Sequence, residues 1–239
     1  MIRLTFLYLL FGILSKIGYG QDSNTLKAFK LPEKTFKVAG KTQQTPLEKP
    51  LKMVAFIDPL ASSLNREAEV WKYFIGSMDT DSIGFVFVVR DNSDMVNFKH
   101  YWFEEMEMDY PFFHDKGNRI FDINEISDER SRQTMLLNRN NEIVLTGGSP
   151  INTDPFNRYR SELHKRTTAM GIAGAVRGVI VEQTESGGIK WFHVNEPVYV
   201  NEDDEVVPTK QAKEGIYSKK WVPGISPLSD TVRLIKRNQ

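Results

Sequence analysis

The sequence contains no cysteine in its 239 residues. This absence excludes a disulfide framework, a thiolate nucleophile and a lipidated cysteine. Net charge is absent as well, because 31 Lys and Arg residues balance 31 Asp and Glu residues. A chain without net positive charge has no global attraction for nucleic acid or for an anionic membrane. We therefore expect no nucleic-acid partner.

A hydrophobic run long enough to cross a membrane is missing too. The run LTFLYLLFGIL near the N-terminus has eleven residues, whereas a spanning helix needs about 20. Arg3 precedes this run and the small, polar stretch SKIGYGQ follows it, which is typical of a secretory signal peptide. We predict a signal peptide over residues 1–20, cleaved after Gly20, and hence an exported protein that is not transmembrane. A membrane anchor is the alternative interpretation of the same run.

Residues 21–50 are polar and lysine-rich and show no sustained period of 2 or 3.6 residues. They are expected to form an N-terminal arm or linker, with a candidate short strand at KTFKVAG. Patterns of strand and helix then alternate. Strands are expected at 51–58, 82–90 and 110–115, and a hairpin is expected over 132–148. Helices are expected from Ser62 or Ser63 onward, over about 95–108 and within 116–127. A last helix is expected from Pro155 onward, with Asp154 as its cap.

The resulting order β, α, β, α, β, β, α predicts an α/β domain. A strand–helix–strand unit makes a right-handed crossover and a parallel pair, and the closing hairpin adds antiparallel strands. The first helix should bury Leu64, Ala68, Trp71, Phe74 and Ile75 against the sheet, with Glu67 complementing the positive helix end. We therefore expect a mixed β-sheet flanked by helices.

The C-terminal part, residues 168–239, is expected to be a β-rich extension. Strand patterns occur at RGVIVEQ, IKWFHVN, PVYVN and EVVPT, with turns at ESGG and at the acidic stretch NEDDE. This acidic stretch lacks the ligand spacing of a calcium loop. The last residues, 219–239, contain prolines and no convincing helix, and they are expected to wrap the domain or to contact a partner.

Three stretches carry a family resemblance: VAFIDPLASSLNREAEVWK, YPFFHDKGNRIFDINEI and TMLLNRNNEIVLTGGSPINTDPFNRY. In this order they resemble exported redoxin-like proteins of the Bacteroidetes type, which have a thioredoxin-like fold. The resemblance covers residues 50–166, about half of the chain, and implies a thioredoxin-like domain over 51–167. It also implies a location in the periplasm or cell envelope of a Gram-negative bacterium.

The resemblance places a Cys-x-x-Cys pair where this chain has Ala61, Ser62, Ser63 and Leu64. It also places a cis-proline where this chain has Gln133, just before Thr134. A helix N-terminus stabilises a cysteine thiolate, but a serine hydroxyl gains little from the same position without an adjacent base. The two serines are therefore expected to cap the helix. The six residues at the two positions are expected to form a vestigial binding groove with no catalytic residue.

The leading hypothesis is a non-catalytic binding or scaffolding module that contacts a protein or peptide in the envelope and needs no cofactor. A second hypothesis is a non-thiol enzyme in which His100, His114 or His164 activates a serine hydroxyl. A purely structural accessory subunit is the third. The four histidines, which include His193, show no two-ligand spacing, so no metal site is predicted.

Overall fold

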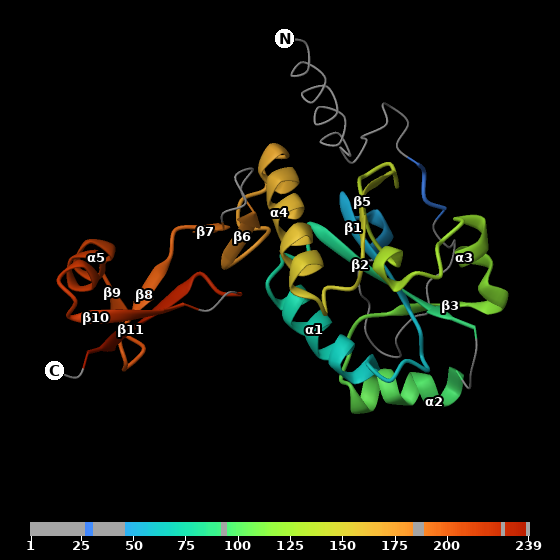
Figure 1. The fold of residues 1–239 in the computed structure, drawn as a ribbon, viewed down its shortest axis with the longest axis horizontal. Coiled ribbons are helices and arrows are strands. Elements are labelled where there is room, and N and C mark those ends of the chain that lie inside the picture. The colour runs from blue at the N-terminus through green and yellow to red at the C-terminus, as the bar shows by residue number, and fades with distance from the viewer. Residues whose placement is uncertain (1–26, 31–45, 92–94, 184–188, 226–227, 238–239) are drawn as a thin grey trace, which may run out of the picture.

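The computed structural model describes residues 27–30, 46–91, 95–183, 189–225 and 228–237 (Figure 1). The predicted signal peptide, most of the predicted arm, including its candidate strand, and the predicted ESGG turn lie outside these residues. None of the described helices is long and apolar enough to cross a membrane.

A five-stranded mixed sheet forms the centre of the larger part of the molecule. Its strands lie in the order β3-β2-β1-β4-β5. The first three are mutually parallel, and the β4–β5 hairpin joins antiparallel to β1. This arrangement confirms the predicted mixed sheet. The strand bounds are β1 Leu51–Ile57, β2 Ile83–Arg90, β3 Phe112–Asp115, β4 Thr134–Leu137 and β5 Ile143–Gly147.

Helices cover both faces of this sheet (Figure 1). They are α1 Leu64–Gly76, α2 Met95–His100, which continues into the π-helical η2 Tyr101–Glu105, α3 Arg119–Ile123 and α4 Thr153–Ala169. Short 3-10 turns are η1 Pro46–Glu48, η3 Lys116–Asn118 and η4 Arg130–Arg132. The predicted apolar face of α1 is buried as expected. The predicted start of α4 is wrong by two residues, because Asn152, and not Asp154, occupies the N-cap position.

The two faces of the sheet have separate cores. The larger core packs α1, α2, η2 and α4 against one face, and Trp71 and Trp102 are each 1% exposed within it. The smaller core lies on the opposite face, where α3 contributes Phe121. The strands β1 and β2 are buried along almost their whole length. This burial on both faces explains why their sequences are continuous apolar runs without alternation.

The described residues of the predicted arm contact the smaller core. Phe29 is buried there, and its backbone N–H donates to the carbonyl oxygen of Asn141 at 2.7 Å. The side chain of Asn124 exchanges hydrogen bonds with the backbone of Lys30. Residues 27–30 are thus held against the β4–β5 hairpin and α3 as an ordered segment.

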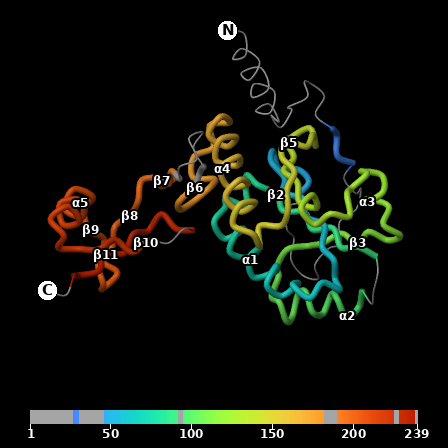
Figure 2. Tube along the Cα trace, in the orientation of Figure 1, coloured from blue at the N-terminus to red at the C-terminus, as the bar shows by residue number. Residues whose placement is uncertain are grey.

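The C-terminal residues form two further sheets (Figure 2). The hairpin of β6 Val179–Gln183 and β7 Ile189–His193 packs against α4. A second unit contains a four-stranded sheet of order β10-β11-β8-β9 and one helix. Its elements are β8 Val198–Val200, β9 Val206–Val207, α5 Thr209–Tyr217, β10 Trp221–Ile225 and β11 Thr231–Lys236.

Two features of this C-terminal part differ from what the sequence predicted. Residues 219–239 were expected to wrap the domain or to contact a partner; their described part does not wrap the domain but forms the hairpin of β10 and β11, and the contact with a partner stays a prediction. Helix α5 was not predicted, because its sequence TKQAKEGIY has few apolar residues. The helix is stabilised by packing: Gly215 lies so close to the ring of Trp221 that an added Cβ would be 2.3 Å from it. The predicted turn at NEDDE does connect β8 to β9.

A partly buried polar joint connects the C-terminal unit to the larger core. Asp230, just before β11, accepts hydrogen bonds from the backbone N–H of Gly178 at 2.7 Å and from the Asn195 side chain at 2.8 Å. Nearby, the buried Arg160 of α4 donates to the carbonyl oxygens of Arg177 and Val179. Burial lowers the pKa of Arg160 to about 10, and the charge of Asp230 opposes this shift.

Candidate functional site

A cavity of about 300 Å³ lies at the carboxyl end of β1. Three connections that are distant in sequence surround it: the loop from β1 to α1, the turn η4 before β4, and the loop from β5 to α4. Most of the residues that line it have polar side chains, and the apolar part of its wall comes from residues such as Phe56 and Ile151. The lining residues are Phe56, Asp58, Ala61, Ser63, Glu67, Arg130, Ser131, Gln133, Thr134, Gly148, Ser149, Ile151 and Asn152. We call this cavity the groove.

The groove brings together four of the six residues that the sequence assigned to a vestigial site. Ala61, Ser63, Gln133 and Thr134 all line it. The other two do not. Ser62 is exposed on the loop, and Leu64 is buried in the larger core.

The expectation that a serine side chain caps α1 with a hydrogen bond is wrong. Ser63 occupies the N-cap position of α1, but its side chain makes no capping hydrogen bond. Its backbone has ψ near 2°, whereas a capping side chain needs an N-cap residue in the extended region. The Ser63 hydroxyl instead accepts a hydrogen bond from Arg130 at 3.4 Å.

Arg130 joins two walls of the groove. Its guanidinium contacts the hydroxyl of Ser63 and, at 3.4 Å, the carboxylate of Asp58. The side chain is 62% exposed, so these contacts are weak and exchangeable with a ligand. Arg130 therefore supplies a positively charged hydrogen-bond donor that an incoming acceptor can reach.

Gln133 takes a different role from the proline that the resemblance places there. Its side-chain amide donates to the carbonyl oxygens of Ser127 and Asp128, both at 3.2 Å. The main-chain carbonyl oxygen of Gln133 accepts a hydrogen bond from the backbone N–H of Phe56 at 2.9 Å. The side chain is therefore used to hold the preceding loop, and Gln133 shapes the groove through its backbone.

Glu67 is a groove residue that sequence reasoning assigned only to the helix dipole. Burial raises the pKa of its carboxyl group, and the Ser149 hydroxyl and the charge of Arg130 oppose that shift. The buried indole N–H of Trp71, one turn further along α1, also lies toward this carboxyl group without reaching hydrogen-bond geometry. The spacing of four residues from Ser63 to Glu67 was the available signal, because it puts both on one face of α1.

The histidines lie in other environments. His114 is hydrogen-bonded to Asp91 at 2.8 Å, and the ring of His164 lies beside Phe192. His100 lines a separate hollow next to Leu60. Within the described residues, no histidine forms a hydrogen bond to Ser62 or Ser63, and no cluster of three or more acidic or histidine side chains is placed to hold a metal ion.

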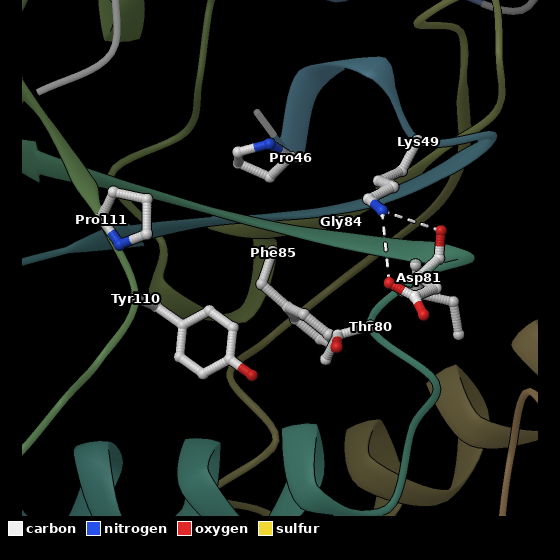
Figure 3. Close-up of a pocket in the computed structure, with 9 residues that line it drawn as sticks. Pro46, Lys49, Thr80, Asp81, Gly84, Phe85, Tyr110 and Pro111 are labelled. Carbon is white, nitrogen blue, oxygen red and sulfur yellow. Dashed lines mark hydrogen bonds and ion pairs between the residues drawn. The ribbon is translucent and has the colours of Figure 1, made fainter. Parts of the chain in front are cut away.

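A second cavity, of about 190 Å³, lies near the start of β2 (Figure 3). Lys49 points across it and donates to the backbone oxygen of Asp81 at 2.9 Å. Tyr110 and Phe85 form its apolar wall, and Pro46 closes it from the side of η1. The cavity therefore lies between η1, the start of β2 and the two residues that precede β3.

Comparisons with known proteins add fold neighbours. No protein-family model matches the sequence, and no match was found among curated proteins. Among solved structures, StoA from Bacillus subtilis is 18% identical, with 46% of this chain and 83% of that one aligned at a TM-score of 0.39. The thioredoxin domain of a thiol-disulfide oxidoreductase from Bacteroides vulgatus is 13% identical, with 48% and 81% aligned at a TM-score of 0.37. A secreted disulfide oxidoreductase from Mycobacterium tuberculosis is 12% identical, with 48% and 84% aligned at a TM-score of 0.36.

The strand order and the helices on both faces of the chain's own sheet identify the fold class as thioredoxin-like. Two of these solved structures are described as a thiol-disulfide oxidoreductase and a disulfide oxidoreductase, whereas this chain contains no cysteine. A chain without a thiol cannot form the mixed disulfide through which such exchange proceeds.

Proposed function

We propose that this protein is an exported binding module of the bacterial envelope and that its groove holds an extended segment of a partner protein. Binding involves no electron exchange. One observation carries the proposal: the chain has no cysteine at the groove, and the groove is nevertheless a cavity of about 300 Å³. It is enclosed by Ala61 and Ser63, by η4 and by the loop before α4.

The chemistry of the groove supports a polypeptide ligand. Arg130 offers an exposed donor, and the hydroxyls of Ser63, Ser131 and Ser149 offer donors and acceptors on three sides. These groups match backbone carbonyl and N–H groups of an extended chain. Export is supported by the N-terminal sequence, in which Arg3 precedes a short apolar run and small residues follow it.

Site-specific photo-crosslinking tests the proposal. A photoreactive amino acid at Ser131, which is exposed on the rim of the groove, should give a discrete crosslinked product with an envelope protein. The same amino acid at Arg66, exposed on α1 but outside the groove lining, is the matched control. The variant Ser63→Trp, which fills the groove, should remove the Ser131 product.

Two results would reject the groove as the contact surface. One is an equal yield of the same product from Ser131 and from Arg66. The other is a Ser131 product that persists at full yield in the Ser63→Trp background. A folded Ser63→Trp protein, checked by near-UV circular dichroism, is required for this comparison.

The serine-enzyme hypothesis has no comparable support. It needs a histidine within hydrogen-bond distance of Ser62 or Ser63, about 2.6–3.2 Å. In the described part of the chain the hydroxyl of Ser63 is bonded to Arg130, which is a donor and not a base.

A further inference from the structure

The groove contains one carboxylate that is partly withdrawn from water and has no cation bound to it. Glu67 lines the groove from the first turn of α1. None of the described residues forms an ion pair with it, because the guanidinium of Arg130 contacts Asp58 and Ser63 instead, each at 3.4 Å. Burial of a charge is costly unless an opposite charge or hydrogen bonds compensate for it. A cation that enters the groove would therefore stabilise the carboxylate of Glu67.

The hydrogen-bond donors around Glu67 compensate for its charge only in part. The hydroxyl of Ser149 favours the charged form of the carboxyl group. The indole N–H of Trp71 lies toward the same group but has no hydrogen-bond partner among the described residues, and this side chain is 1% exposed. A carboxylate drawn toward the indole would complete this bond at the cost of deeper burial. A cation at its outer oxygen would offset that cost, so the unpartnered N–H favours a charged ligand at Glu67.

The charges around the groove favour a cation over an anion. The charged side chains that line it are those of Asp58, Glu67 and Arg130. Asp58 is already engaged, because one of its oxygens accepts the backbone N–H of Leu60 at 3.0 Å and the other contacts Arg130. The negative charge of Glu67 is thus the one that remains without a counter-charge in contact.

The lining of the groove suits a cation on an aliphatic stem. Lysine and arginine place their charge at the end of such a stem. Phe56 and Ile151 offer apolar surface to the stem, and the hydroxyls of Ser131 and Ser149 can accept hydrogen bonds from its charged end. A metal ion is a poorer fit, since the described residues contain no cluster of three acidic or histidine side chains that could hold one.

We propose that the partner segment in the groove carries a lysine or arginine whose charged group binds the carboxylate of Glu67. This inference rests on the proposed function, because it names the side chain that an extended segment presents to the groove. Glu67 then determines which segments bind, while Arg130 and the serine hydroxyls bind the backbone of the segment.

Selection from a peptide library tests this proposal. The probe is a mixture of short random peptides, capped at both ends so that neither terminus carries a charge. The full chain is immobilised, and the retained peptides are sequenced by mass spectrometry. At one position of the aligned peptides, lysine and arginine together should be enriched over glutamine and norleucine roughly tenfold, which is the size expected for a partly buried charge pair.

Three variants separate the role of Glu67 from a general effect on the groove. Glu67→Gln keeps the shape of the side chain and removes its charge, so it should abolish the enrichment. Glu69→Gln is the matched control and should keep it, because Glu69 is exposed on the same helix outside the groove lining. Arg130→Gln removes the competing cation and should increase the enrichment, which a misfolded protein would not do. Near-UV circular dichroism checks the fold of each variant.

The outcomes distinguish this inference from the proposed function. Peptide retention that Ser63→Trp does not reduce rejects the groove as a binding site, and the role of Glu67 with it. Retention that needs the open groove but shows no preference for lysine or arginine, or a preference for acidic peptides, rejects the role of Glu67 alone. A preference that Glu67→Gln leaves unchanged rejects it as well.

Discussion

Replacing Tyr159 by phenylalanine removes one buried hydrogen bond between a helix and the wall of the groove. The Tyr159 hydroxyl, on α4, donates to the carbonyl oxygen of Thr134 at 2.6 Å, and the side chain is 1% exposed. Phenylalanine keeps the ring and its packing but leaves that carbonyl without this donor. A buried hydrogen bond contributes about 1 kcal/mol net, and an unsatisfied buried group costs about 1–3 kcal/mol. We expect Tyr159→Phe to lower the free energy of unfolding by about 1–2 kcal/mol at pH 7.

The pH dependence of this effect follows from the titration of the phenol. Burial raises the pKa of Tyr159 above its ordinary value of 10. The folded state therefore keeps the proton where the unfolded state loses it. The stability that this hydroxyl contributes is complete below pH 10 and is lost progressively as the pH rises above 10. The difference between wild type and Tyr159→Phe should thus shrink in strongly alkaline solution.

Urea unfolding followed by tryptophan fluorescence measures both the stability difference and its pH dependence, because Trp71 and Trp102 are buried in the larger core and report on its unfolding. Wild type and variant are compared at pH 7 and again above pH 10. A difference below 0.3 kcal/mol at pH 7, taken here as about the limit of such measurements, would refute the assigned hydrogen bond. A difference that grows above pH 10 would refute the assigned direction of the pKa shift.

Three further substitutions test other parts of the account. Gly84→Ala would place a Cβ 2.1 Å from the carbonyl oxygen of Pro46, so it should lower the free energy of unfolding by about 1–3 kcal/mol. In the control Gly76→Ala the new Cβ meets no atom within 4 Å, so this variant should not lower the free energy of unfolding. Glu67→Gln should raise the thermal midpoint at pH 7, because burial raises the pKa of Glu67 and disfavours its charged form, and this gain should disappear as the pH falls below 4.5. Asp230→Ala removes the acceptor for Gly178 and Asn195, and it should speed proteolytic cleavage between the C-terminal unit and the larger core without changing the near-UV circular dichroism of that core.

The sequence predicts the main sheet and α1 well because their signals are local. Buried strands such as β2 appear as unbroken apolar runs, and the apolar side chains of α1 recur at helical spacing. The C-terminal unit was predicted less well. Helix α5 is short and polar, and β10 contains Pro223 and Gly224, which usually interrupt a strand. Both elements are stabilised by contacts with each other, such as that of Gly215 with Trp221, and a local pattern does not contain that information.

The residues of the groove were likewise predicted only in part. Positions 61, 63, 133 and 134 followed from the resemblance of three stretches to a known fold. The loop from β5 to α4, with Ser149 and Asn152, was missed because only the antiparallel hairpin brings it next to α1. The contact between Arg130 and Ser63 spans 67 positions in the sequence. It replaced the expected capping hydrogen bond because the backbone of Ser63 is not extended.

Crosslinking from Ser131 is the measurement that addresses the central claim most directly. The claim is that a thioredoxin-like groove without cysteine still binds a polypeptide. It predicts one discrete crosslinked product from Ser131 that is lost in the Ser63→Trp background and is not formed from the control position Arg66. A product that Ser63→Trp leaves unchanged, or that Arg66 gives in equal yield, would contradict it.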